Sequence, residues 1–174
     1  SEAIAAGGFS EDQILQIAAS LDQGSEHPLA DAIVTEARRR GLALDKAEGF
    51  DSVTGLGVRG VIGDRAVALG NTVLMAELGV DVTSLSDSAE RLRKLGASAM
   101  FLAIDGSAAG VIGVADPIKA TSAAALEALR AAGIRIVMAT GDGATTAQAV
   151  GLALGIDEIH GEVRPQDKLE LVGR

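Results

Sequence analysis

The sequence contains no cysteine, no tryptophan and no tyrosine, and it has only two histidines, His27 and His160. Without cysteine the chain forms no disulfide, uses no thiolate in catalysis and holds no cysteine-ligated metal. Two histidines without any cysteine do not provide the cluster of ligands that a zinc site needs. Because aromatic residues make up 2% of the chain and hydrophobic residues 48%, we expect a core of alanine, valine, isoleucine and leucine.

Basic residues are scarce as well, with 15 lysines and arginines against 24 aspartates and glutamates. The net charge of −9 argues against nucleic acid as a partner, because that binding relies on clustered basic side chains. The one basic run, Arg38-Arg39-Arg40, precedes Gly41 and indicates a helix end. No stretch reaches about 18 uninterrupted apolar residues, and no signal-peptide pattern is present. The composition therefore predicts a soluble cytosolic piece.

The stretch Ser25-Glu26-His27-Pro28-Leu29 is the most informative part of the chain. Proline suits the first position of a helix, so we expect a helix from Pro28 to Gly41 with His27 as its N-cap. The positive end of the helix dipole disfavours imidazolium, which predicts a neutral ring that stacks on or hydrogen-bonds a heteroaromatic ring. The alternative is that His27 only caps the helix.

Two glycine motifs follow this stretch. The first, Gly55-Leu56-Gly57, lets backbone approach a ligand closely, although a tight turn before a strand gives the same string. The second, Gly70-Asn71, comes after a hairpin expected over 58–69 with its turn at Gly63-Asp64. Asn71 is expected to cap a helix over 72–78, and the alternative is a role in a ligand site.

Helices and hairpins alternate over residues 10–109. Ser10 and Gln13 form a capping box that begins the first helix, and a second hairpin is expected over 100–104 and 108–114 around the Asp105-Gly106 turn. This alternation predicts an antiparallel sheet with helices packed on it.

The pattern changes after Asp116 to helix, strand, helix, strand, helix. We expect helices over 121–132 and 145–154 and a buried parallel strand over 134–139. The string Thr140-Gly141-Asp142-Gly143 follows that strand, at the sheet edge where open α/β folds bind ligands. A threonine hydroxyl and free helix amides suit a phosphoryl oxygen there, but the string is equally good turn chemistry.

The order of these motifs, with Asp116-Pro117 and Pro165-x-x-Lys168 added, resembles the cytoplasmic ATP-binding region of heavy-metal P-type ATPases, most of all the copper-transporting branch. The resemblance covers nearly the whole chain. It implies a nucleotide-binding domain of antiparallel sheet and flanking helices over 1–112, joined to a partial haloacid-dehalogenase-like parallel α/β domain over 113–174. The nucleotide-binding residues that it implies are Asp22, Glu26, His27, Gly55, Gly57, Gly70, Asn71 and Asp116. The catalytic residues that it implies are Thr140, Asp142 and Lys168.

The resemblance also implies individual roles. The family's matching lysine, here Lys168, reaches the transferring phosphoryl group, and Thr140 matches a donor to that group. Asp116 matches an aspartate at the hinge between the domains. Asp22 stands where the family has a glutamate that meets the adenine amino group; it keeps the acceptor charge but is one methylene shorter. Glu26 is the neighbouring candidate for this contact.

Two strings of the family are missing, Asp-Lys-Thr-Gly-Thr with the phosphorylated aspartate and Gly-Asp-Gly-x-Asn-Asp with the magnesium ligands. We therefore interpret the chain as a fragment of a larger pump, with the first string expected just before Ser1. The fragment is expected to bind ATP or ADP without turning it over, and Mg²⁺ is expected to act in the intact pump.

The intact pump is expected to move copper or another soft heavy metal across a membrane, with this chain on the cytoplasmic face. Its expected partners are adenine nucleotide and the transmembrane, actuator and remaining phosphorylation-domain parts of the same pump. Two alternatives stay open. A phosphatase of the haloacid dehalogenase type would use Thr140 and Lys168 but lacks its Asp-x-Asp string, and in a non-catalytic docking domain His27 and the glycines are purely structural.

Overall fold

The computed structural model describes residues 1–115, 118–163 and 167. The chain forms two compact units, the first made of residues 1–89 and 99–114 and the second of residues 90–98 and 115–174. The chain passes from the first unit to the second after Val114. The domain boundary expected from the sequence, between 112 and 113, stays a prediction. Residues 90–98 precede this boundary and nevertheless pack with the second unit.

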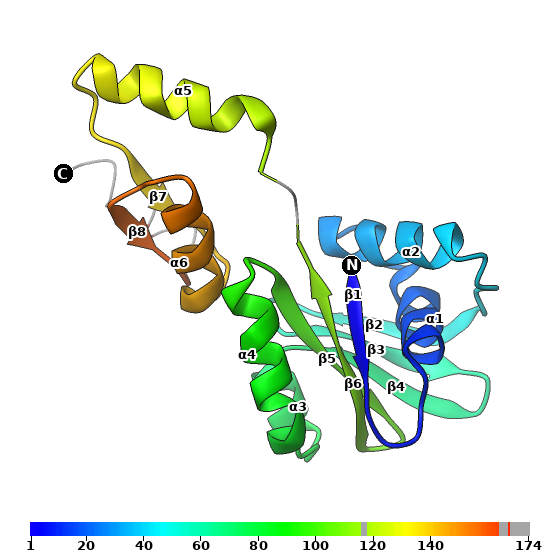
Figure 1. Ribbon diagram of the computed structural model, residues 1–174. Coiled ribbons are helices and arrows are strands. Elements are labelled where there is room, and N and C mark those ends of the chain that lie inside the picture. The colour runs from blue at the N-terminus through cyan, green and yellow to red at the C-terminus, as the bar shows by residue number, and fades with distance from the viewer. Residues whose placement is uncertain (116–117, 164–166, 168–174) are drawn as a thin grey trace. The chain divides into compact units, whose positions relative to one another are not determined.

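The first unit is built on a six-stranded sheet with the strand order β1-β6-β5-β4-β3-β2 (Figure 1). Strand β1 pairs with β6, and β2, β3, β4 and β5 pair in succession, all antiparallel. The antiparallel sheet predicted from the sequence is confirmed. The strands are β1 (Glu2–Ala5), β2 (Ala47–Val53), β3 (Gly57–Ile62), β4 (Arg65–Gly70), β5 (Ser98–Ile104) and β6 (Ser107–Val114).

Both predicted hairpins are confirmed. Strands β3 and β4 meet at the Gly63-Asp64 turn, and β5 and β6 meet at the Asp105-Gly106 turn, where Asp105 has a positive φ of 50°. The Asp105-Gly106 turn is tied to the start of β4, because the carboxylate of Asp105 accepts a hydrogen bond of 2.9 Å from the Ala66 amide. Strand β1 has no counterpart in the sequence-based expectations.

Three helices of the first unit begin where the sequence signals them: α1 (Glu11–Asp22), α2 (Pro28–Arg39) and α3 (Thr72–Glu77). Helix α2 ends two residues before the expected Gly41, and α3 ends one residue before the expected position 78. The capping box of Ser10 and Gln13 is present at the start of α1. The basic run ends α2, where Arg39 and Arg40 both bind the carboxylate of Glu36. A short 3₁₀ helix (Thr83–Leu85) and α4 (Ser86–Lys94) follow α3, and α4 continues into the second unit.

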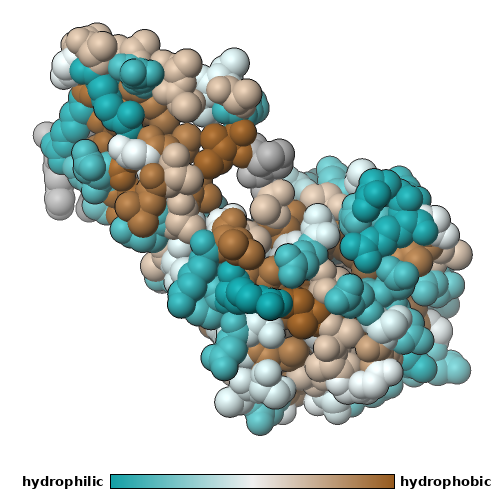
Figure 2. Space-filling model, viewed as in Figure 1, coloured by the Kyte–Doolittle hydropathy of each residue, from teal (hydrophilic) through white to brown (hydrophobic). Residues whose placement is uncertain are grey.

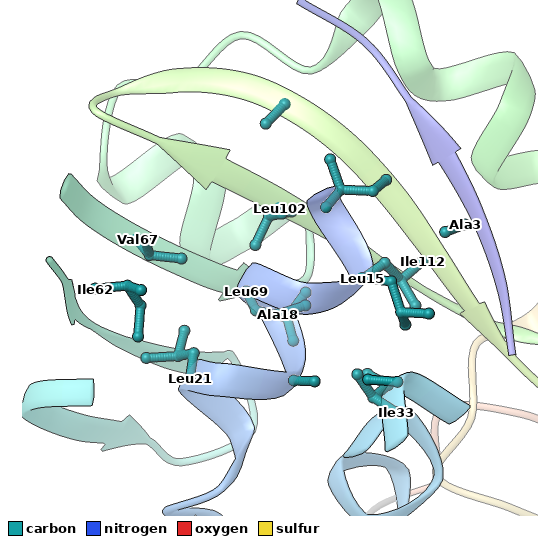
Figure 3. Close-up of a cluster of buried hydrophobic side chains, with 14 of the residues drawn as sticks. Ala3, Leu15, Ala18, Leu21, Ile33, Ile62, Val67, Leu69, Leu102 and Ile112 are labelled. Carbon is teal, nitrogen blue, oxygen red and sulfur yellow. The ribbon is translucent and has the colours of Figure 1, made fainter. Parts of the chain in front are cut away.

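The core of the first unit lies between the sheet and the helices α1 and α2 (Figure 3). Successive turns of α1 bury one face against side chains from β3, β4, β5 and β6, which is the predicted aliphatic core. On β5, Phe101 and Ala103 are also buried although they alternate with the core residues Leu102 and Ile104. Fully buried members of the core include Ile14, Leu15, Ala18, Leu21, Ile33, Leu69, Leu102 and Ile112.

The second unit contains α5 (Ala120–Ala131), β7 (Val137–Ala139), α6 (Ala144–Ala153) and β8 (Glu158–His160). Strands β7 and β8 are parallel, as the sequence predicts for this part of the chain. Strand β7 is shorter than the expected 134–139 and is not buried: Val137 is 40% exposed, and within the described ranges only β8 pairs with this strand. Figure 2 shows apolar side chains on the surface of this unit, at the upper left.

Candidate functional site

A cavity of about 270 Å³ lies in the first unit, where the end of α1, the start of α2 and the turn between β2 and β3 meet. Its lining includes the predicted site residues Asp22, His27, Gly55, Gly57 and Asn71. The other lining residues are small or apolar, a composition typical of pockets for small organic ligands. They are Ser25, Leu29, Ala30, Ser52, Val53, Leu56, Val58, Leu69 and Met100.

His27 occupies the N-cap of α2, as predicted, with Pro28 at the first helical position. Its Nδ1 accepts a hydrogen bond of 3.2 Å from the Leu29 amide, and its own amide donates to the Ser25 hydroxyl. A ring nitrogen that accepts a hydrogen bond carries no proton, so in this arrangement the ring is neutral and Nε2 carries the hydrogen. The ring is exposed at the cavity, which leaves its face and its Nε2–H available to a ligand.

Asp22 ends α1 and is only 5% exposed, although it lines the cavity. Within the part of the chain that the structure describes, its carboxyl group forms no hydrogen bond or ion pair, and the two oxygens keep a small contact with solvent. Burial raises the pKa of this carboxyl to about 7, because a desolvated charge is costly when no cation or donor faces it. A carboxyl group with this pKa is partly uncharged near pH 7, whereas the sequence analysis expects an acceptor charge at Asp22.

Asn71 is the N-cap of α3, as predicted, and both the oxygen and the nitrogen of its side-chain amide form hydrogen bonds. Its Oδ1 accepts from the amides of Val73 and Leu74 at 3.0 and 3.1 Å, and its Nδ2 donates to the Gly55 carbonyl at 3.0 Å. The Asn71 side chain thus holds the glycine loop of the cavity against the start of α3. This role is structural, and Asn71 also lines the cavity.

The three glycines of the two motifs differ in the space that surrounds them. Gly57 and Gly70 are paired across β3 and β4, and a Cβ on either would collide with the neighbouring backbone, at Leu69 or Leu56 respectively. Both are therefore needed for the close approach of these strands. Gly55 has a φ of 75° and no atom within 4 Å of an added Cβ, so it alone borders open space in the cavity.

Two of the other predicted residues do not line the cavity, and two residues that line it were not predicted. Glu26 is exposed and Gly70 lies behind Gly57, and neither lines the cavity. Conversely, Ser52 and Met100 line the cavity and have no signal in the sequence, because they arrive from β2 and β5, far along the chain from His27. Only the paired strands bring them to this place.

A second group of predicted residues lies in the loop between β7 and α6 of the second unit. Thr140 donates its hydroxyl hydrogen to one carboxylate oxygen of Asp142 at 2.7 Å, and the Asp142 amide donates back to that hydroxyl at 3.1 Å. The Ser98 hydroxyl donates to the other carboxylate oxygen at 3.0 Å. Ser98 is a partner that the sequence does not reveal, since 44 residues separate it from Asp142.

Hydrogen bonds hold this loop at the carboxyl end of β7. The Thr140 amide donates to the His160 carbonyl, and the Glu162 amide donates to the Asp142 carbonyl. The first amides of α6 have no side-chain cap. Asp116 and Lys168, which complete the predicted set, lie outside the described residues.

No group of three histidine or acidic side chains within the described ranges is placed to hold a metal ion. Nor is any helix there both long and apolar enough to cross a membrane.

The sequence model of the haloacid dehalogenase-like hydrolases matches residues 2–174. The chain belongs to this family. A curated member of similar sequence is the copper-transporting P-type ATPase of Rhizobium leguminosarum bv. viciae, which is 48% identical over 166 residues. That match covers 95% of this chain and 20% of the relative, so the chain spans about a fifth of that protein.

Solved structures of heavy-metal P-type ATPases have a fold similar to that of this chain. The chain is similar to a zinc-transporting PIB-type ATPase, with a TM-score of 0.69 and 27% identity over 98% of this chain and 28% of that one. It is also similar to the N-domain of HMA8, a copper-transporting P-type ATPase, with a TM-score of 0.56 and 26% identity over 66% of this chain and 98% of that one. The resemblance to heavy-metal P-type ATPases and the fold class are confirmed.

Proposed function

We propose that this chain is the ATP-binding region of a copper- or other heavy-metal-transporting P-type ATPase, and that its cavity binds the adenosine of ATP or ADP. The observation that carries the proposal is the single cavity in which α1, α2 and the glycine loop bring together Asp22, His27 and Gly55.

The chemistry of the cavity suits a purine. Leu29, Val58 and Met100 offer apolar walls, and the neutral ring of His27 offers a flat face for stacking together with a donor at Nε2. Gly55 lets backbone approach the ligand because no side chain stands in the way. Asp22 supplies the only polar side chain of the cavity that is both buried and without a partner among the described residues.

In the intact pump, Thr140 would donate to the phosphoryl group that is transferred, Lys168 would neutralise its charge, and Asp116 would help to position the nucleotide. Asp142 holds the Thr140 hydroxyl, so the hydroxyl hydrogen must turn from Asp142 toward a phosphoryl oxygen to take this role. Among the described residues, no three acidic or histidine side chains gather into a metal cluster, and we assign no step to magnesium here. The phosphorylated aspartate, the actuator and the membrane part would come from other regions of the pump, with this chain on the cytoplasmic face.

Isothermal titration with ATP, together with amide chemical-shift mapping, tests the proposal. We expect saturable binding, with shifts concentrated at Asp22, His27 and Gly55. The variant His160→Ala is the matched control, because His160 lies on β8 outside the cavity and its loss should leave binding unchanged. A flat titration with ATP, ADP and adenosine would instead support a docking domain without a nucleotide site.

A further inference from the structure

The carboxyl group of Asp22 is in an unusual position for an acidic side chain. It is 5% exposed, it lines a cavity of largely apolar character, and no donor or cation among the described residues reaches it. A carboxylate that accepts no hydrogen bond in such surroundings pays most of its desolvation cost uncompensated. The uncharged acid avoids this cost, and it also gains an O–H group that needs an acceptor.

Charged groups near the cavity do not offset the desolvation cost of an ionised Asp22. His27 is the one other ionisable residue in its lining, and its Nδ1 is committed to the Leu29 amide. Asp51 and Arg59, on β2 and β3, are exposed and pair with each other at 2.7 Å. Asp31 on α2 and Glu2 on β1 are exposed and outside the lining. The charged residues Asp45, Lys46, Glu48 and Arg65 line a different cavity.

The two forms of the carboxyl group present different patterns to a base. The ionised form offers two acceptors, whereas the acid offers one acceptor and one donor side by side. The edge of adenine presents a donor, the exocyclic amine, beside an acceptor, the ring nitrogen N1. The acid matches both groups, but the ionised form matches only the amine and sets its second oxygen against the lone pair of N1.

We propose that the cavity recognises adenine through the uncharged carboxylic acid of Asp22, whose O–H donates to N1 and whose carbonyl oxygen accepts from the exocyclic amine. This rests on the proposed function. Nucleotide binding then requires a proton on Asp22, so affinity falls as the pH rises through the range in which this group ionises. A pump with this chain as its ATP-binding region would bind ATP more weakly in an alkaline cytosol.

The size of the effect follows from linkage. If only the acid binds and the pKa of Asp22 in the free protein is about 7, the dissociation constant rises about tenfold between pH 6 and pH 8. The variant Asp22→Asn is the sharp comparison, because its amide also places a donor beside an acceptor and cannot ionise. We expect Asp22→Asn to bind ATP with an affinity close to that of the wild type at pH 6 and without this pH dependence.

Titration calorimetry with ATP at pH 6, 7 and 8, in two buffers of different ionisation enthalpy, measures affinity and proton uptake together. The wild type should take up close to one proton at pH 8 beyond the uptake of Asp22→Asn, which corrects for the titration of the phosphates. The variant His27→Asn, which keeps a helix cap and removes the imidazole, should bind more weakly but retain the pH dependence. Loss of the pH dependence in this variant would assign the proton to His27 and overturn the inference.

A ligand analogue tests the same contact without any change in the protein. In 1-deaza-ATP a C–H replaces N1 while the triphosphate is unchanged, so the proton uptake specific to Asp22 should disappear. Uptake equal to that of ATP would overturn the inference. Wild-type affinity that is flat or rises with pH, with weaker binding by Asp22→Asn, would also overturn it and leave the nucleotide site standing. Absence of ATP binding at every pH would refute the proposed function itself.

Discussion

His27 carries two separable roles, a helix cap and a flat surface at the cavity. We expect His27→Ala to weaken ATP binding by about 1 to 2 kcal/mol through lost stacking and hydrogen bonding. It should also lower the free energy of unfolding by about 1 kcal/mol, since alanine is a poor N-cap. Asparagine is among the best caps, so His27→Asn should restore stability and leave the binding defect. Calorimetry and urea unfolding of both variants separate the roles, and full recovery of binding in His27→Asn would leave His27 with capping alone.

Asp22 should make the stability of the free protein depend on pH. Its pKa is raised from 3.8 to about 7 in the folded state by burial, so the folded chain binds the proton more tightly than the unfolded chain. The stability that this proton supplies is complete below about pH 4 and is lost as the pH rises to about 7. The shift corresponds to roughly 4 kcal/mol of unfolding free energy.

The variant Asp22→Asn removes this titration. Its unfolding free energy, measured with urea from pH 4 to pH 8, should fall less with pH than that of the wild type and should exceed the wild-type value above pH 7. Asp64→Asn, in the exposed turn between β3 and β4, is the matched control and should follow the wild type. Parallel pH profiles for wild type and Asp22→Asn would show that Asp22 ionises in the folded protein as it does in water.

At the residue scale, the sequence correctly predicted that His27 and Asn71 are helix N-caps, because a cap depends on neighbours within a few positions. The state of Asp22 depends on strands far along the chain that remove its water, and no local pattern reports that. For the same reason the hydrogen bond from Ser98 to Asp142 was not predictable from either segment alone.

The junction of β3 and β4 beside the cavity gives a prediction at the scale of elements. At Gly57 the φ of 147° is strained for any side chain, and a Cβ would meet the Leu69 carbonyl, so Gly57→Ala should cost roughly 2 to 4 kcal/mol of unfolding free energy. Gly55→Ala has a positive φ but open space and should cost about 1 to 2 kcal/mol. Urea midpoints of the two variants give the comparison, and equal losses would contradict the packing role assigned to Gly57.

Elements with strong local signals were predicted well, and weak or short ones were not. The turns Gly63-Asp64 and Asp105-Gly106 fix their hairpins, because both favour the positive φ values that such turns need. Strand β1 has only four residues and no strong local signal, and it is held by its antiparallel pairing with β6. The expected strand over 134–139 shrinks to β7, since an apolar run becomes a long buried strand only where neighbours cover it.

At the scale of the whole molecule, the proposed adenosine cavity lies in the first unit and the Thr140–Asp142 loop in the second. The order of motifs along the chain predicts that these two groups of residues have separate roles, and this stays a prediction. The geometry within each unit required the structure, because Met100 and Ser98 reach their places only through strand pairing and packing.

This division predicts how the chain ranks nucleotides. The residues proposed to contact adenosine form one cavity, whereas the described residues show no metal cluster that would hold magnesium against the γ-phosphate. We therefore expect ATP, ADP and a non-hydrolysable ATP analogue to bind with similar, modest affinity, with and without magnesium, because each presents the same base and ribose. Competition calorimetry with the three nucleotides measures this ranking. Binding that requires both magnesium and the γ-phosphate would instead place the main contacts at the phosphates, and the second unit would then have to supply them.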